Sequence, residues 1–596
     1  MQFLRHSFNM RYLSIFILIH LSITTGAQGL KVNGSRIINA AGNEVILRGF
    51  GLGGWMLQEP YMLDLSGAAV AQYDIRNKIT DLIGKERTAA FYEAWLNNHC
   101  TKADIDSLAA WGFNSVRLPL HYNLFTLPVE EEPVKNRNTW LVKGFQLTDS
   151  LLSWCKTNHV YLILDLHAAP GGQGNDNAIA DRDDSKPSLW QSEANKNKTI
   201  ALWKKLAARY AGEEWIGGYD IINEPNWGFR DHADTHGCNE KENLALRKLY
   251  LDITAAIRKA DKKHIIFIEG NCWANNYNGI FPLWDDNIVI SFHKYWNYTT
   301  DGSIQNFLNL RDKYNVPLWM GETGENSNTW FTNVLMLLEK NRIGWNMWPL
   351  KKAGMNNPFQ IKINSSAQKV IDYLKGNGSK PDASEAFSGL MQLAIDTKTG
   401  NNIFHRDVTD AMMRQVSETA TIPFKQNIIE TNTILFASDY DIGRAGIAYH
   451  DKDSAEYWVE TSVRTPWNIG GQYRNDGVDI ETCKDDITNG YNVGWIEAGE
   501  WMQYSLYVTG DEVFDVNVRY AAKDNAGRIR LILNDEFISE DQVLTPTGAN
   551  QKWKTNTIKN IKLTKGWNRF RILATAGGFN LNYLQFLRSG NSVMSD

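Results

Sequence analysis

The chain has 596 residues, a formal net charge of -5, and contents of 43% hydrophobic and 22% charged residues. This length exceeds one ordinary domain, and the composition is that of a globular protein. The slight negative charge gives no electrostatic reason to expect a nucleic-acid partner. The 22 tryptophans and 23 tyrosines suit a protein that stacks on flat apolar faces such as sugar rings.

The first 28 residues have the pattern of a secretion signal. Arg5 and Arg11 precede an apolar run at 12–23, and small residues at 25–27 offer a cleavage site. The run is too short for a comfortable membrane span, and no later stretch is long enough for one. We therefore expect a secreted protein, extracellular or periplasmic, without a membrane span. A buried N-terminal helix is the alternative.

The cysteines are widely spaced, odd in number and free of CxxC spacing: Cys100, Cys155, Cys238, Cys272 and Cys483. This pattern argues against a disulfide scaffold and against a zinc site. A single disulfide is compatible with it, but the spacing names no pair.

Eight short apolar runs alternate with helical patterns between about residues 45 and 348. They are VILRGFGL, NSVRLPL, VYLILDLH, GGYDIINEP, HIIFIEG, NIVISFHKY, VPLWMGE and IGWNMWP. They lack strict alternation, as strands covered on both faces do. Between the second and third runs, Leu147, Leu151 and Trp154 share one helical face. The pattern predicts a closed (β/α)8 barrel, with a doubly wound open sheet as the competing topology.

Polar residues lie at or near the ends of several runs: Arg117, His167, Glu224, Glu269, His293 and Glu322. In a barrel such positions meet at the C-terminal mouth, where active sites are built. Cleaving a glycosidic bond with retention needs two carboxyl groups about 5–5.5 Å apart. Glu224 and Glu322, from the fourth and seventh runs, can supply them. Glu269, Asp165 and Glu325 are rival carboxylates.

After Lys352 the chain changes character. A loop, GNGSKPDAS, is followed by helix-like segments near 385–394 and 404–418, and short alternating strands begin near residue 429. Such strands predict an all-β sandwich. We expect a barrel with a helical extension over 29–420, a jelly-roll sandwich over 430–589 and a tail at 590–596.

The motifs NEP at 223–225 and WMGETGEN at 319–326 resemble two signature strand ends of glycoside hydrolase family 5. These retaining (β/α)8-barrel enzymes include cellulases, mannanases and exo-β-1,3-glucanases, and the resemblance covers about residues 40 to 355. It implies Glu322 as nucleophile and Glu224 as acid/base. It also implies that Arg117 braces the nucleophile and that His167 and Asn223 contact the sugar. His293 and Tyr295 would support the two carboxylates, and Trp348 would form an aromatic floor under the sugar.

These roles carry electrostatic expectations. Glu322 has to be ionised to attack, and the charge of Arg117 is expected to lower its pKa. Glu224 has to hold a proton near neutral pH and release it in the second step. Esterification of Glu322 removes a negative charge and so favours that release.

The resemblance implies a β-glucan substrate and leaves the linkage open between β-1,3, β-1,4 and β-1,6. LRGFGLGGWMLQEPY and DLHAAPGGQGNDN resemble the exo-β-1,3-glucanase branch, whereas VPLWMGETGENSNTWF and IGWNMWPLKK are closer to endo-acting β-glucanases. A β-mannanase and a transglycosylase are alternatives on the same barrel. A non-catalytic polysaccharide-binding protein is disfavoured because both carboxylates are present.

The segments YRNDGVDIETCKDDITNGYNVGWIEAGEWMQYSLYV and GGFNLNYLQF resemble carbohydrate-binding module family 6. The resemblance implies a sugar cleft with Trp495 as one aromatic and Asn580, or else Asn582, as the donor. Asn550 stands where a second aromatic is usual, so weak binding or none is expected. Ser438 replaces a calcium-binding glutamate, so we expect no calcium and no other cofactor. The expected state is a monomer with a polysaccharide or oligosaccharide substrate, and a sandwich that only packs on the barrel is the alternative.

Overall fold

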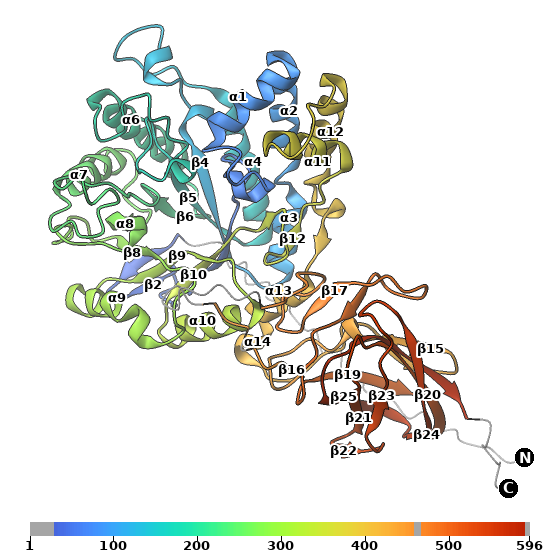
Figure 1. Ribbon diagram of the computed structural model, residues 1–596. Coiled ribbons are helices and arrows are strands. Elements are labelled where there is room, and N and C mark those ends of the chain that lie inside the picture. The colour runs from blue at the N-terminus through green and yellow to red at the C-terminus, as the bar shows by residue number, and fades with distance from the viewer. Residues whose placement is uncertain (1–28, 454, 458–466, 590–596) are drawn as a thin grey trace, which may run out of the picture.

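The computed structural model describes residues 29–453, 455–457 and 467–589. The predicted signal at 1–28 and the tail at 590–596 lie outside these residues. An N-terminal barrel and a C-terminal β-sandwich lie side by side, with the sandwich next to the helices α13 (Arg406–Met412) and α14 (Arg414–Ser417) (Figure 1). Within the described ranges, no helix has the length and apolar character needed to cross a membrane.

Eight parallel strands close the barrel, and each pairs with its neighbours in the sequence. They are β3 (Arg48–Gly51), β4 (Ser115–His121), β5 (Tyr161–Ala168), β6 (Ile216–Asp220), β7 (Ile266–Glu269), β8 (Ile288–His293), β9 (Leu318–Gly324) and β10 (Gly344–Trp348). Pairing of β10 with β3 completes the closure. All eight predicted runs are therefore barrel strands, and the open-sheet alternative is wrong.

The strands are apolar throughout because both of their faces are covered: every residue of β4 and β5 is buried. The covering helices are α3 (Lys102–Ala110), α4 (Val142–Asn158), α6 (Glu193–Tyr210), α7 (Leu244–Arg258), α9 (Asp301–Tyr314) and α10 (Asn328–Lys340). The predicted helix at 145–159 is α4, which buries Phe145, Leu151 and Cys155. A hairpin of β1 (Lys31–Asn33) and β2 (Arg36–Ile38) packs Leu30 and Ile37 against the strand beginnings, at the end opposite the mouth.

A second group of helices shares its own apolar core beside the barrel. It consists of α1 (Gln72–Ile83), α2 (Lys85–Asn98), α11 (Ser365–Leu374) and α12 (Ala383–Asp396). The helix-like segment predicted near 385–394 is part of α12, and the one near 404–418 is split into α13 and α14. The segments before and after α11 and α12 form a small three-stranded sheet of β11 (Lys351–Lys352), β12 (Phe359–Gln360) and β13 (Ile403–Phe404).

The C-terminal part forms two packed sheets, in the orders β14-β19-β25-β21-β22 and β17-β18-β26-β20-β24. The short strands among them are β14 (Asn427–Ile429), β17 (Ile480–Thr482), β18 (Tyr491–Val493) and β22 (Glu536–Phe537). Their longest strands are β19 (Trp501–Val508), β20 (Glu512–Ala521), β21 (Gly527–Leu533), β24 (Lys554–Leu563), β25 (Gly566–Ala576) and β26 (Asn580–Arg588). Burial alternates along them, as in β21, because one face packs inward and the other meets solvent. The fold class expected from the sequence is therefore confirmed.

Candidate active site

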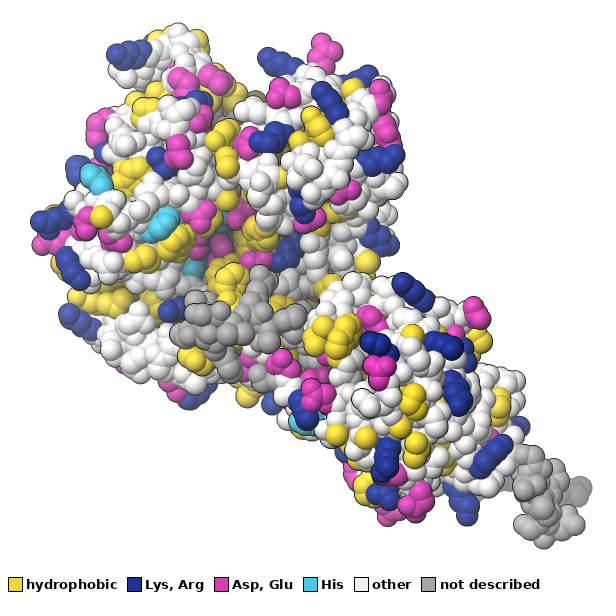
Figure 2. All heavy atoms as spheres, viewed as in Figure 1, with side chains coloured by type: hydrophobic (Ala, Val, Ile, Leu, Met, Phe, Trp, Pro, Cys, Tyr) yellow, Lys and Arg dark blue, Asp and Glu magenta, His cyan; other side chains and the backbone are white. Residues whose placement is uncertain are grey.

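Two buried glutamates face each other at the C-terminal mouth of the barrel. Figure 2 shows acidic side chains within a hollow on this face. Glu322 lies on β9, Glu224 follows β6, and each is 5% exposed. One carboxylate oxygen from each glutamate and a ring nitrogen of His293 lie within 4.8 Å of one another. That spacing fits the separation of about 5–5.5 Å in retaining glycosidases and is too short for the roughly 6.5–9.5 Å of inverting ones.

Glu322 is held through both carboxylate oxygens. Arg117 Nη1 donates to Oε2 at 2.9 Å, and the Tyr295 hydroxyl donates to Oε1 at 2.7 Å. Burial and the charge of Glu224 raise the pKa of Glu322, in spite of the opposing charges of His293 and Arg117. Arg117 does lower this pKa, as expected, but burial and Glu224 outweigh its effect and the pKa is raised on balance.

Arg117 is shared among several groups. This fully buried guanidinium also pairs with three further carboxylates, Asp165 at 3.2 Å, Asp220 at 3.0 Å and Glu269 at 3.1 Å. Its Nη2 donates to Asn223 Oδ1 at 2.7 Å. Burial raises the pKa of Asp165 to about 8, of Glu269 to about 7 and of Asp220 to about 6. One positive charge cannot keep so many buried carboxylates ionised, so the cluster holds protons near neutral pH. The rival carboxylates Asp165 and Glu269 are thus partners of Arg117.

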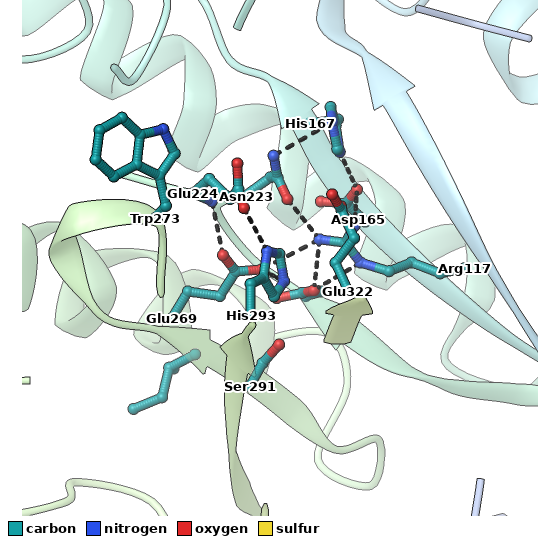
Figure 3. A network of polar contacts seen from close by, with 12 residues as sticks. Arg117, Asp165, His167, Asn223, Glu224, Glu269, Trp273, Ser291, His293 and Glu322 are labelled. Atoms are coloured by element: carbon teal, nitrogen blue, oxygen red, sulfur yellow. Dashed lines mark hydrogen bonds and ion pairs between the residues drawn. The ribbon is translucent and has the colours of Figure 1, made fainter. Parts of the chain in front are cut away.

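Glu224 is held by His293 and Glu269 (Figure 3). His293 Nδ1 lies 2.7 Å from Glu224 Oε1, and its Nε2 lies 3.2 Å from Glu269. Glu269 also accepts the backbone N–H of Glu224 at 2.6 Å. Burial would lower the pKa of His293, but the charge of Glu269 and the hydrogen bond to Glu224 raise it well above its ordinary value. A protonated His293 donates from Nδ1 to Glu224, while its Nε2 forms an ion pair with Glu269.

The cluster of Glu224, His293 and Glu322 is tight enough to ligate a metal ion. A metal-binding imidazole needs a free nitrogen lone pair. Here the two nitrogens of His293 face two carboxylates, and the pKa of His293 is raised. The residues therefore fit a proton-sharing site better than a metal site.

Trp348 forms an aromatic floor beside the two carboxylates. Its ring stacks on His167 with centroids 5.1 Å apart and an interplanar angle of 7°, and its Nε1 donates to the Tyr61 hydroxyl at 2.9 Å. Burial lowers the pKa of His167 to about 4, which leaves this ring neutral. A Cβ added at Gly51 would lie 2.3 Å from the Trp348 ring. The absence of a side chain at Gly51 thus makes room for the Trp348 ring.

Asn223 is oriented by two neighbours. Its Oδ1 accepts from Arg117, and its Nδ2 lies 3.3 Å from His167 Nε2. All eight barrel residues expected from the sequence therefore meet at the mouth: Arg117, His167, Asn223, Glu224, His293, Tyr295, Glu322 and Trp348.

Three mouth residues were not predicted as part of the site. Burial raises the pKa of Glu59 well above its ordinary value, and the charges of Glu322, Glu325 and Glu224 raise it further, so Glu59 belongs to the same group of acidic side chains at the mouth. Tyr61 bonds Trp348, and Asp220 bonds Arg117. The sequence signal for Glu59 and Tyr61 was the EPY that interrupts an apolar segment directly after the first strand.

A disulfide joins the loop after β6 to the segment after β7, between Cys238 and Cys272. Next to it, Trp273 lies on the Glu224 side of the site (Figure 3), and its backbone N–H donates to the Pro225 carbonyl at 3.2 Å. The three remaining cysteines are buried thiols. The sequence spacing could not name this pair because the fold brings the two loops together.

The predicted sugar-binding residues of the sandwich lie close together. Trp495 is 46% exposed and follows Gly494, where an added Cβ would lie 3.2 Å from Asn580 Oδ1. The Asn580 amide donates to Glu481 at 2.6 Å and to the Asn550 carbonyl at 2.9 Å. Its donors are therefore engaged within the protein. Sugar binding by Trp495 and Asn580 stays a prediction.

Asn582, the alternative donor, is fully buried and bonds Asp485 and the Ile487 carbonyl. Ser438, which stands where a calcium-binding glutamate is usual, is also fully buried and accepts from Asn489 at 3.0 Å. Neither residue presents a free polar group at the surface of the cleft.

Comparison with known proteins relates both parts of the chain to carbohydrate-active families. Residues 73–354 match the cellulase family described as glycosyl hydrolase family 5. Residues 474–586 match carbohydrate-binding module family 35. The second match corrects the expected family 6, while the expectation of a carbohydrate-binding module is confirmed.

Several curated fungal proteins are similar over the barrel. A beta-xylosidase of Phanerodontia chrysosporium is 28% identical, over 56% of this chain and 72% of its own length. A glucan 1,3-beta-glucosidase of Candida oleophila is 28% identical, over 43% of this chain and 57% of its own. A probable glucan 1,3-beta-glucosidase A of Aspergillus niger is 26% identical, over 43% of this chain and 56% of its own. The chain thus spans little more than half the length of the two glucosidases.

A solved structure, Cellulase Cel5C_n, is 17% identical with a TM-score of 0.37, over 60% of this chain and 93% of its own. At that score it adds no argument to the family matches. The barrel thus matches the cellulase family, glycosyl hydrolase family 5, over residues 73–354, and the sandwich matches carbohydrate-binding module family 35 over residues 474–586.

Proposed function

We propose that this chain hydrolyses a β-glucan with retention of anomeric configuration, by double displacement. The observation that carries the proposal is the pair of buried carboxylates, Glu224 and Glu322, with oxygens within 4.8 Å. Arg117 and Tyr295 hold Glu322, while His293 holds Glu224. The two glutamates thus have different partners, as two different roles require.

In the first step Glu322 attacks the anomeric carbon, and Glu224 gives its proton to the leaving glycosidic oxygen. The bond to the leaving sugar breaks as the ester bond to Glu322 forms. In the second step Glu224 takes a proton from water, whose oxygen attacks the anomeric carbon and releases Glu322. Arg117 and Tyr295 hold Glu322 in place through both steps, and Asn223 is placed to bond the sugar next to the reacting carbon.

We propose a β-1,3-linked glucan as the preferred substrate. Two curated relatives carry the name glucan 1,3-beta-glucosidase, and the flat floor of Trp348 suits the apolar face of a glucose unit. A β-xyloside is the second candidate, because the Phanerodontia chrysosporium relative is called a beta-xylosidase.

The test is hydrolysis of β-1,3-, β-1,4- and β-1,6-linked gluco-oligosaccharides, xylo-oligosaccharides and manno-oligosaccharides, with the anomer of the first product followed by NMR. We expect retained configuration and the highest kcat/KM on a β-1,3-glucan. Glu322→Gln should abolish turnover, and azide should rescue Glu224→Ala on an activated aryl glycoside. Inverted products, or full activity of Glu322→Gln, would contradict the proposed mechanism.

We further propose that the protein is extracellular. The disulfide between Cys238 and Cys272 supports this, because disulfides persist mainly in oxidising compartments. Carbohydrate binding by the C-terminal module, a monomeric state and the absence of bound calcium belong to the same proposal. Binding of the full chain to insoluble glucan with and without EDTA, together with its mass in solution, tests these points.

A further inference from the structure

The C-terminal module is fixed to the barrel by buried polar contacts with the residues that follow β9, the strand that carries Glu322. The Asn328 N–H donates to the Asn475 carbonyl at 3.0 Å, and its Nδ2 donates to Asp476 at 2.8 Å. Asn475 Nδ2 donates back to the Asn326 carbonyl at 2.9 Å. All four residues are at most 2% exposed. Separation of the domains would leave these buried groups unpaired, so the module keeps one orientation on the barrel.

A second contact lies nearer the mouth. Asn326 Nδ2 donates to the Tyr457 carbonyl at 2.9 Å, and Asn333 Nδ2 donates to Glu456 at 2.6 Å. The Tyr457 ring lies 5.8 Å from the ring of Trp296. Asn326 comes four residues after Glu322, and Trp296 comes three residues after His293. The module therefore places Tyr457 against the two loops that carry Glu322 and its supports.

Tyr457 is connected to the catalytic groups through these loops. Trp296 contacts the ring of Tyr295 at 5.8 Å, and the Tyr295 hydroxyl donates to Glu322. Trp296 Nε1 also donates to the Glu325 carbonyl at 2.9 Å. Further contacts lead from Glu325 to Trp348. Glu325 forms an ion pair with Lys352, and Lys352 lies over the ring of Tyr61. The Tyr61 hydroxyl in turn accepts a hydrogen bond from Trp348.

We propose that Tyr457 is a specificity-determining residue which, beside Trp296, forms a subsite for a sugar unit beyond the one that reacts on Trp348. This inference rests on the proposed glycoside hydrolase function. Tyrosine offers an apolar ring face and a polar tip, which match the faces and hydroxyls of a pyranose. The half-buried Tyr457 ring is supplied by the module, so the module forms part of the substrate cleft.

The test compares substrates of different lengths in the full chain. The variants are Tyr457→Ala, Tyr457→Phe and, as a matched control, Trp567→Ala, which removes a 62% exposed aromatic from β25 of the module. Each is assayed on an activated aryl β-glycoside of one sugar and on gluco-oligosaccharides of two to six units. Stacking of one ring on a sugar corresponds to a roughly three- to tenfold change in kcat/KM.

We expect Tyr457→Ala to lose that factor on the longer oligosaccharides and to stay within about twofold of the wild type on the one-sugar substrate. Tyr457→Phe should keep most of the activity on both, and Trp567→Ala should match the wild type. An equal loss on all substrates, no loss on any, or the same loss in Trp567→Ala would overturn the subsite. A wild-type chain that cleaves no glycoside would instead overturn the proposed function, and the subsite with it.

Discussion

Replacement of Tyr295 by phenylalanine isolates the hydrogen bond that holds the proposed nucleophile. The Tyr295 hydroxyl donates to Glu322 Oε1 at 2.7 Å, while Arg117 binds the other oxygen. The substitution removes one oxygen atom and leaves the ring and its contact with Trp296 in place. The variant thus tests how much one donor contributes to the ionised state of Glu322.

The expected effect has a definite sign. A hydrogen bond to a carboxylate favours the charged form, so its loss raises the pKa of Glu322 above a value that burial and Glu224 already raise. A bond to a charged group is worth about 1.5–3 kcal/mol. Since about 1.4 kcal/mol corresponds to one pKa unit, the pKa of Glu322 should rise by about one to two units.

The assay is kcat/KM against pH with an activated aryl β-glycoside, whose leaving group needs little help from Glu224. The acidic limb of this profile reports ionisation in the free enzyme, so we expect it to move to higher pH in Tyr295→Phe. Tyr507→Phe, in β19 of the module, is the matched control and should leave the profile unchanged. An acidic limb that stays in place or moves to lower pH would refute this account of Glu322.

Three further predictions concern the surroundings of this pair. Glu269→Gln removes the charge that most raises the pKa of His293, so NMR titration of that imidazole should show a lower pKa, and an unchanged value would contradict the assignment. Gly51→Ala places a methyl group 2.3 Å from Trp348, so we expect an altered tryptophan fluorescence and at least a tenfold loss of kcat/KM. Gly212→Ala, where an added methyl group meets open space, should keep its activity, and an equal loss there would contradict this account. Burial raises the pKa of Asp165 to about 8, so its protonated form stabilises the fold at acid pH, and this contribution is lost as pH rises from about 4 to about 8. Because Asp165→Asn cannot ionise, the Tm of this variant should fall less than that of the wild type over the same pH range. An equal fall in Tm would argue against a raised pKa of Asp165.

The sequence predicted the barrel well because a strand buried on both faces leaves a continuous apolar run, and eight such runs have few alternatives. It also predicted which polar residues meet, because strand ends converge at one mouth. It could not predict the balance of charge there. Asp220 stands within an apolar run, and its place beside Arg117 depends on which strands are neighbours. Nor could it show that burial and Glu224 outweigh the effect of Arg117 on the pKa of Glu322.

The disulfide and the module contact show a different limit. Cys238 and Cys272 are 34 residues apart and lie in loops, whose paths leave no periodic signal. Tyr457 and Trp296 are in separate domains, so only the docking of the module brings them together. Local patterns predict elements, whereas contacts between loops depend on the complete fold.

The charges at the mouth explain why two chemically identical side chains can take different roles. Five carboxylates surround two cations, Arg117 and His293. Arg117 cannot lose its proton at any working pH, so Glu322 always faces a fixed positive charge. Glu224 instead faces His293, a group that can exchange a proton with it. In the proposed mechanism, esterification of Glu322 removes one negative charge from this group of side chains. His293 can then stabilise the carboxylate form of Glu224, which accepts a proton from water. The difference between the proposed nucleophile and the proposed acid/base thus lies in their partners: Glu322 faces a cation that keeps its proton, and Glu224 faces one that can share it.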